Sequence, residues 1–321
     1  MNNRIQENHH ADGVDRRGFL QCMAWAGTGV LWTLSSGVLS SRALGREAGA
    51  SGEPASAGSL RFVQISDSHI GFNKPVNPDV TATLRETISR INRLGDAPEF
   101  ILHTGDLTHL AEPDEFDTLE QALKDCRTKQ VFYVPGEHDI LSDDGAAYRE
   151  RFGRQAFGQG WYSFDQKGVH FIGLVNVQNI AEGGLGILGD EQLVWLAKDL
   201  APLSAETPIV VFAHVPLWMV YPKWGWGTDD GAKALLLLKR FGSVTVLNGH
   251  IHQALQKIEG NITFHTARST AFPQPAPGAA PKAGPMPVPG GQLRSYLGLS
   301  SVTYLENHPT LAVVDSTLAS G

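Results

Sequence analysis

Residues 62–69 read FVQISDSH, a short apolar run that ends in an aspartate and a histidine separated by one residue. Short runs of β-branched and aromatic residues are typical of buried β-strands. In open α/β sheets, ligands bind at the edge where the strands end. Asp67 and His69 therefore stand where a strand gives way to a loop, and on an extended backbone both side chains can reach one metal ion.

The same pattern, an apolar run followed by residues that bind metals, recurs four times further along the chain. The apolar runs are residues 100–102, 131–134, 209–212 and 244–247. The polar groups that follow them are Gly105-Asp106, Gly136-Glu137-His138-Asp139, His214 and Gly249-His250-Ile251-His252. These side chains offer enough oxygen and nitrogen ligands for two ions of Mn, Fe or Zn. Two such ions would hold a phosphoryl group and lower the pKa of a bridging water.

The five polar groups resemble the motifs of the calcineurin-like metallophosphoesterase superfamily, which read D-x-H, G-D, G-N-H-[DE], a single H, and G-H-x-H. The match runs from Asp67 to His252 in the same order. The resemblance implies an α/β fold, a four-layer α/β/β/α sandwich in which helices flank two mixed sheets. It also implies hydrolysis of phosphate mono- or diesters by metal-bound hydroxide, without a covalent enzyme intermediate.

The resemblance implies a role for each matched residue. Seven would be metal ligands: Asp67, His69 and His252 at the first ion, Glu137, His214 and His250 at the second, and Asp106 bridging both. His138 would lie near the phosphate, either as proton donor to the leaving group or as stabiliser of the transition state. Asp139 would orient His138.

Two positions depart from the family pattern. Position 137 is Glu where the family usually has Asn, which adds a negative charge at the second ion. His109 stands where many members have Asp or Asn, and the sequence gives it no definite role. Residues 105–109 also lack the pattern of the protein serine/threonine phosphatases. The resemblance is therefore closer to the phosphodiesterase-like branch.

Two alternatives to a general phosphoesterase stay open. The first is a cyclic nucleotide phosphodiesterase, in which an aromatic cluster after His214 would stack on a base; packing within the loop explains the cluster equally well. The cluster consists of Trp218, Tyr221, Trp224 and Trp226. The second is a non-catalytic metal- or ligand-binding protein that keeps the fold but has lost activity through Glu137.

Residues 1–43 have the features of a twin-arginine signal peptide. Arg16 and Arg17 precede a weakly apolar stretch at 23–39, and small residues at Ser41 and Ala43 suit a signal peptidase. We therefore expect the twin-arginine export machinery as a partner and a periplasmic or secreted protein with no stable membrane span after processing. Residues 44–59 read as a flexible linker and 60–321 as the metallophosphoesterase domain.

Composition narrows the remaining choices. The net charge is -7 and no basic patch is present, which argues against nucleic acid as a main partner. The family resemblance implies a phosphate ester as the substrate. Cys126 would be alone after processing, so no intramolecular disulfide is expected. Residues 272–291, rich in Pro, Ala and Gly, predict a long loop that is either disordered or lies over the site.

The remaining elements are predicted from apolar periodicity. Helices are expected from Asn77-Pro78 to 94, from 115 to 126, near 148, from a capping Asp190 to 200, and from about 230 to 238; a hairpin is expected at 161–174. The G-x-G-x-x-G at 184–189 reads as a turn, because no strand precedes it. Four histidines are predicted to be structural, with no partner expected for the first two: His103, His170, His265 and His308.

Overall fold

The protein is described by a computed structural model that covers residues 29–35, 38–44, 59–153, 156–181, 183–306 and 311–319. Strands β1 (Gly29–Ser35) and β2 (Val38–Leu44) pair antiparallel in a first unit, and the other elements belong to a second unit, Ser56–Gly321. Arg16, Arg17, most of the predicted linker at 44–59 and His308 lie outside the described residues. Among the described residues, no helix has the length and apolar character needed to cross a membrane.

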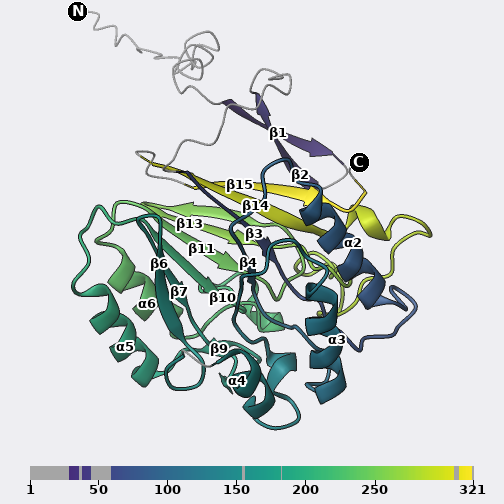
Figure 1. Cartoon of the computed structure of the whole chain (residues 1–321), viewed down its shortest axis with the longest axis horizontal. Helices are drawn as coiled ribbons and strands as arrows, with labels where there is room; N and C mark the ends of the chain where they lie inside the picture. Colours follow the sequence, from purple (N-terminus) through teal and green to yellow (C-terminus); the bar gives the residue numbers. More distant parts are fainter. Residues whose placement is uncertain are drawn as a thin grey trace, which may run out of the picture. The chain divides into compact units, whose positions relative to one another are not determined.

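Two mixed sheets form the centre of the second unit (Figure 1), with strand orders β15-β14-β3-β4-β5 and β12-β13-β11-β10-β7-β6. The first sheet contains β3 (Ser59–Ile65), β4 (Phe100–His103), β5 (Val131–Tyr133), β14 (Gly298–Leu305) and β15 (Ala312–Thr317). The second contains β6 (Tyr162–Gln166), β7 (Val169–Gly173), β10 (Ile209–Ala213), β11 (Val244–Asn248), β12 (Gln256–Glu259) and β13 (Ile262–Thr266). Strands β3, β4 and β5 are mutually parallel, as are β7, β10, β11 and β13.

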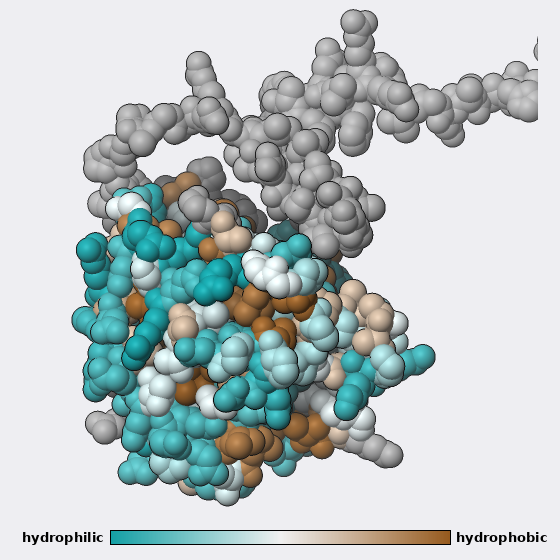
Figure 2. Space-filling model, turned by 90° about the vertical axis from the view of Figure 1, so that its right-hand side faces the viewer, coloured by the Kyte–Doolittle hydropathy of each residue, from teal (hydrophilic) through white to brown (hydrophobic). Residues whose placement is uncertain are grey.

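Helices cover the outer faces of both sheets (Figure 1). Helices α2 (Val80–Asn92) and α3 (Pro113–Leu123) lie beside the first sheet, and α5 (Asp190–Leu200) and α6 (Gly231–Leu238) beside the second. A short helix, α4 (Ala146–Phe152), and a small sheet of β8 (Asn179–Ile180) and β9 (Gly186–Ile187) complete the frame. The side of the molecule at the right of Figure 1 is mainly hydrophilic, with separate apolar patches (Figure 2).

Alternating side chains along the strands create the layers. In β3, Phe62 faces the space between the sheets while Val63 packs toward α2 and α3. In β10, Val210 faces the other sheet and Val211 faces α5 and α6. Phe62 meets Phe171 of β7 edge-to-face, with ring centroids 5.4 Å apart, and each such buried ring contributes about 1.5–3 kcal/mol. The predicted four-layer α/β/β/α sandwich is confirmed.

Three helix starts differ from the predictions for local reasons. Helix α2 begins after Pro78, because the carboxylate of Asp79 accepts the N–H of Ala82 at 2.9 Å and caps the helix. Helix α3 begins earlier than expected, with Pro113 in its first turn, where the missing N–H costs no helical bond. Asp190 is the first residue of α5 and not its cap, since Gly189 holds that position.

The expectation that His103 and His170 have no partners is wrong. His103 Nε2 lies 2.9 Å from the hydroxyl of Ser68. His170 is paired at both ring nitrogens, with Asp165 at 2.8 Å and Asp199 at 2.9 Å. Ser68 lies in a neighbouring loop, Asp165 in the paired strand β6 and Asp199 in helix α5. The apolar run around each histidine therefore could not predict these partners. Both residues remain part of the framework and lie outside the cavity described below.

Candidate metal centre

The loops after five parallel strands meet at one edge of the two sheets, and they bring together all seven residues for which sequence predicts a metal-binding role. In the first sheet, Asp67 and His69 follow β3, Asp106 follows β4, and Glu137 begins the short 3-10 helix η1 (Glu137–Ile140) after β5. In the second sheet, His214 follows β10, and His250 and His252 follow β11.

Asp67, His69 and His252 form the first group of candidate ligands. Their ligand atoms lie within 4.8 Å of one another. His252 Nε2 is 3.2 Å from Asp67 Oδ1 and 3.3 Å from His69 Nε2. The other nitrogen of His252, Nδ1, lies 2.6 Å from the carbonyl oxygen of Phe272, so it donates there and leaves Nε2 as an acceptor. A backbone carbonyl behind the ring is the usual partner of a metal-binding histidine.

Glu137, His214 and His250 form the second group. Glu137 Oε2 is 3.0 Å from His214 Nε2, and Glu137 Oε1 is 3.0 Å from His250 Nδ1. Despite these short separations, Glu137 Oε2, His214 Nε2 and His250 Nδ1 are buried without a hydrogen bond. His214 Nδ1 donates to the carbonyl of Thr104 at 2.7 Å, which again leaves Nε2 facing the group.

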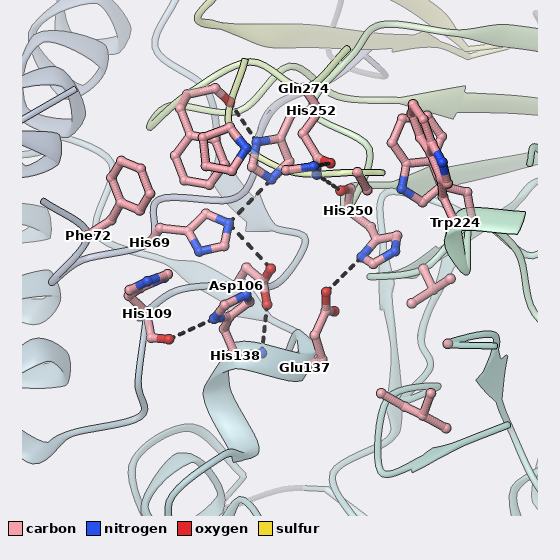
Figure 3. Close-up of a pocket in the computed structure, with 18 residues that line it drawn as sticks. His69, Phe72, Asp106, His109, Glu137, His138, Trp224, His250, His252 and Gln274 are labelled. Carbon is pink, nitrogen blue, oxygen red and sulfur yellow. Dashed lines mark hydrogen bonds and ion pairs between the residues drawn. The ribbon is translucent and has the colours of Figure 1, made fainter. Parts of the chain in front are cut away.

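Asp106 lies between the two groups (Figure 3). Its Oδ2 is 3.4 Å from His69 Nε2 in the first group and 3.4 Å from His214 Nε2 in the second. Its other oxygen, Oδ1, accepts the backbone N–H of His138 at 3.0 Å, which fixes the orientation of the carboxylate. One oxygen of Asp106 is therefore shared by both groups, as a bridging ligand requires.

The donor set fits two cations. Buried polar atoms nearly always have partners, so several unpaired nitrogens and oxygens converging at one place indicate a site for positive charge. Burial lowers the pKa of His69 well below its usual value, and burial together with nearby His138 keeps the ring neutral, as a ligand must be. Burial raises the pKa of Glu137, but His250 and His214 outweigh it and hold that pKa well below the usual range.

The backbone at this edge is held in an unusual conformation. Eight non-glycine residues in the described part of the chain have positive φ. Five of them are candidate ligands: Asp67, His69, Asp106, His250 and His252. Such conformations cost on the order of 1–3 kcal/mol each and concentrate at functional sites. The fold thus maintains strained loop backbones that aim these side chains toward one another.

The glycines of the motifs are required by close contact. A Cβ on Gly136 would lie 2.0 Å from Asp106 Oδ1, and one on Gly105, where φ is +94°, would lie 2.4 Å from His214 Nδ1. Any side chain at either position would displace a candidate ligand. The glycines that precede Asp106 and Glu137 are therefore part of the site.

Asp139 does not orient the His138 ring, contrary to the prediction. Its carboxylate accepts the N–H groups of Leu107, Thr108 and Gly136 at 2.8–3.0 Å and ties the loop after β4 to the loop after β5. Burial and the neighbouring Asp106 raise the pKa of Asp139 to about 7, against those backbone bonds, which lower it. Its oxygens are used by backbone groups, so it positions the loops and not the ring.

The partner of His138 is His109, whose role the sequence left undecided. His138 Nδ1 lies 2.6 Å from the His109 carbonyl oxygen, and the two rings stack with centroids 4.9 Å apart (Figure 3). Nδ1 therefore donates to this carbonyl, and Nε2 is left to face other groups. Burial lowers the pKa of His138, but Asp106 and Glu137 outweigh it and raise that pKa above the usual value.

A cavity of about 400 Å³ opens over these groups. Aromatic rings and a segment of the Pro-rich loop form much of its wall: Phe72, Trp224, Trp226, Phe272, Gln274 and 283–285. No lysine or arginine is among the described residues that line it. The aromatic cluster predicted after His214 divides, because Trp224 and Trp226 face the cavity whereas Trp218 packs on Phe264, with ring centroids 4.8 Å apart. The Pro-rich loop lies over the site.

The sequence matches the calcineurin-like phosphoesterase family over residues 60–254. The chain belongs to this family. As a calcineurin-like phosphoesterase, it is a metal-dependent phosphoric ester hydrolase. Its clustered Asp, Glu and His side chains lie within the matched residues.

Individual relatives are distant. A probable cyclic nucleotide phosphodiesterase from Vesicomyosocius okutanii is 27% identical over 66% of this chain and 86% of its own length. A serine/threonine-protein phosphatase from Danio rerio is 26% identical over 61% of this chain and 71% of its own. Among solved structures, a dimetal phosphatase from Danio rerio superposes with a TM-score of 0.58, 15% identity, and coverage of 81% of this chain and 98% of that one. The solved structure supports the fold.

Glu137 distinguishes this calcineurin-like phosphoesterase from the usual family pattern. Substituting it tests whether this carboxylate binds metal and how its charge affects activity. We expect Glu137→Asn to weaken binding of one of two metal ions while activity at excess metal holds or rises. The reason is that a carboxylate cancels part of the pull of the ions on an anionic phosphate. Metal titrations followed by turnover assays measure both effects.

Glu137→Asn changes both charge and length, because Asn is one methylene shorter than Glu. Glu137→Gln is therefore the matched variant, since it removes the charge and keeps the length. If weaker metal binding appears in the Asn variant alone, length and not charge is responsible. If neither variant changes metal affinity, Glu137 is not a ligand.

Proposed function

We propose that this chain is an exported phosphoesterase with two metal ions that hydrolyses phosphodiesters in preference to phosphomonoesters. The ions would be held by Asp67, His69 and His252 on one side and by Glu137, His214 and His250 on the other, with Asp106 between them. Bound there, Mn, Fe or Zn would supply Lewis acidity and lower the pKa of a coordinated water.

The charge of the cavity is the observation that carries the preference for diesters. Among the residues that the structure describes, its lining includes the carboxylates of Asp106 and Glu137 but no lysine or arginine. A monoester near neutral pH carries close to two negative charges, and a diester carries one. Because the described lining holds no lysine or arginine to pair with phosphate and Glu137 adds a negative charge, the less charged ester is the better fit.

His138 is proposed to act on the leaving group. It lines the cavity, and its Nδ1 is fixed by the His109 carbonyl, so that Nε2 can hold a proton toward the ester oxygen that departs. The ring is 4.8 Å from that of His69, which keeps it next to the first group of candidate ligands. Asp139 would support this chemistry indirectly by holding the two loops together.

A cyclic nucleotide is a second candidate substrate, and Trp224 is the observation that favours it. This half-buried indole lines the cavity together with Trp226, and an indole face can stack on a nucleobase with a contribution of about 1–3 kcal/mol. A similar relative is named a probable cyclic nucleotide phosphodiesterase. Competition between a cyclic nucleotide and a simple nitrophenyl diester would measure this preference.

The test of the proposed function compares two nitrophenyl esters. With Mn, Fe or Zn supplied, we expect kcat/KM for bis-p-nitrophenyl phosphate to exceed that for p-nitrophenyl phosphate by roughly 10-fold or more, the equivalent of about 1.4 kcal/mol. The Glu137→Gln variant should narrow the ratio, because it removes one negative charge. A higher kcat/KM for the monoester would contradict the preference. A protein that binds two ions but hydrolyses neither ester would favour the non-catalytic alternative.

Export by the twin-arginine route is proposed from Arg16 and Arg17, which precede the weakly apolar stretch at 23–39. We expect Arg16→Lys with Arg17→Lys to stop export and leave an active precursor in the cytoplasm, because the pair itself is recognised and the charge is not sufficient. Cell fractionation with an activity assay measures this. Unchanged export of the double variant would indicate the general secretory route instead.

A further inference from the structure

Gln274 joins the Pro-rich loop to the candidate metal centre through both ends of its side-chain amide. Gln274 Nε2 donates to the backbone carbonyl of His250 at 2.8 Å (Figure 3). Gln274 Oε1 accepts the N–H of Gly284 at 2.9 Å. Both ends of the amide are therefore used. Gln274 therefore connects the loop that carries His250 and His252 to Gly284, which lies ten residues after Gln274 in the chain.

The segment between these anchors closes on itself. The N–H of Met286 donates to the carbonyl of Pro273 at 2.8 Å, next to the bond between Gln274 and Gly284. Gln253 holds the base of the segment through bonds to the carbonyls of Gln274 and Pro275. We call residues 273–286 the closed loop. Because it contains no helix or strand, its shape depends on these few bonds.

The closed loop forms part of the cavity wall. Its residues 283–285 line the cavity together with Gln274 and Trp224. Near the middle of the closed loop, a Cβ added to Gly278 would be only 3.4 Å from the hydroxyl of Tyr221, so the closed loop approaches the aromatic segment around Trp224. Pro285 is exposed, so this part of the wall lies at the edge of the cavity, and its position affects the width of the cavity mouth.

We propose that Gln274 is a positioning residue that determines substrate specificity, because it holds residues 283–285 at the cavity mouth and thereby limits the size of the ester group that the site accepts. This inference rests on the proposed function and names a selectivity device for it. The bond to the N–H of Gly284 sets the position of the wall. The bond to the carbonyl of His250 fixes that wall relative to the candidate metal centre.

The experiment uses Gln274→Leu, which keeps a side chain of similar volume and removes both hydrogen bonds. Its matched control is Gln292→Leu, the same change at an exposed glutamine outside the closed loop and the cavity lining. Two substrates share a leaving group and differ in the second ester group: methyl p-nitrophenyl phosphate and bis-p-nitrophenyl phosphate. Hydrogen exchange of peptides containing Gly284 and the metal content per chain are measured alongside.

We expect Gln274→Leu to raise kcat/KM for the bulky diester relative to the methyl diester by roughly 10-fold. This is the lower end of the discrimination between substrates that a small difference in fit to a pocket provides. Exchange at Gly284 should become faster, while metal content stays as in the wild type. Gln292→Leu should change neither the ratio nor the exchange.

Three outcomes would overturn the inference while leaving the proposed function intact. The first is an unchanged ratio with faster exchange at Gly284, because the loop would then not limit substrate size. The second is an unchanged ratio with unchanged exchange. The third is an equal loss on both diesters with loss of metal, which would mean that Gln274 acts through the His250 loop. A wild type that carries two metal ions and hydrolyses neither diester would instead overturn the proposed function, and this inference with it.

Discussion

Asp106→Asn is expected to remove both metal ions and to lower phosphodiesterase activity by roughly 10³-fold, the rate equivalent of about 4 kcal/mol. Asn keeps an oxygen that accepts the His138 N–H, but its NH₂ group replaces Oδ2, the atom 3.4 Å from both His69 and His214. That group cannot bind a cation. Since both groups of candidate ligands share Oδ2, the two ions should loosen together.

Metal analysis after gel filtration, together with turnover of bis-p-nitrophenyl phosphate, measures this effect. Asp190→Asn is the matched control, because it makes the same chemical change at a carboxylate that is 92% exposed. Retention of two ions per chain by Asp106→Asn would remove Asp106 from the bridging position. Loss of a single ion would show that Asp106 serves one group only.

His138→Ala should leave the metal content unchanged and lower the rate by on the order of 10² to 10⁴ for esters with a poor leaving group. The physical reason is that His138 Nε2 is the proposed proton source for the departing oxygen, and a nitrophenolate needs that proton less than a phenolate does. Diphenyl phosphate has the poor leaving group and bis-p-nitrophenyl phosphate the good one, so the two esters are compared in the variant and the wild type. The loss should be clearly smaller for the nitrophenyl ester.

His138→Asn provides the control for shape and polarity, since its amide can form hydrogen bonds but does not transfer a proton near neutral pH. It should behave like His138→Ala on diphenyl phosphate. Equal losses on both esters in both variants would indicate that His138 stabilises charge in the transition state and does not donate a proton.

Much of the fold could be predicted from local sequence. The apolar runs at 62–65 and 209–212 are long enough for buried strands and too short for helices, and both are strands in the structure. Helix starts were less predictable, because they depend on individual capping bonds such as the one from Asp79 to the N–H of Ala82. The pairing of His170 with Asp199 joins a strand to a helix 29 residues away, and no local pattern encodes it.

The sequence was enough to predict which residues form the candidate site. It was not enough to predict the hydrogen bonds that hold those residues in place. A short motif such as Asp67-Ser68-His69 follows a strand, so its position at the sheet edge could be inferred. The bond from His138 to the His109 carbonyl and the clamp by Gln274 involve backbone groups, which carry no residue-specific signal. For the same reason Asp139 was expected to orient a ring, whereas it binds backbone amides.

The central claim is that two ions at one centre make this chain a phosphodiesterase, and metal-dependent activity tests it most directly. Metal-free protein is titrated with Mn, Fe or Zn while bound metal per chain and turnover of bis-p-nitrophenyl phosphate are measured on the same samples. The account predicts that activity rises with occupancy and reaches its maximum at two ions per chain. Full activity at one ion, or no hydrolysis with two ions bound, would contradict it.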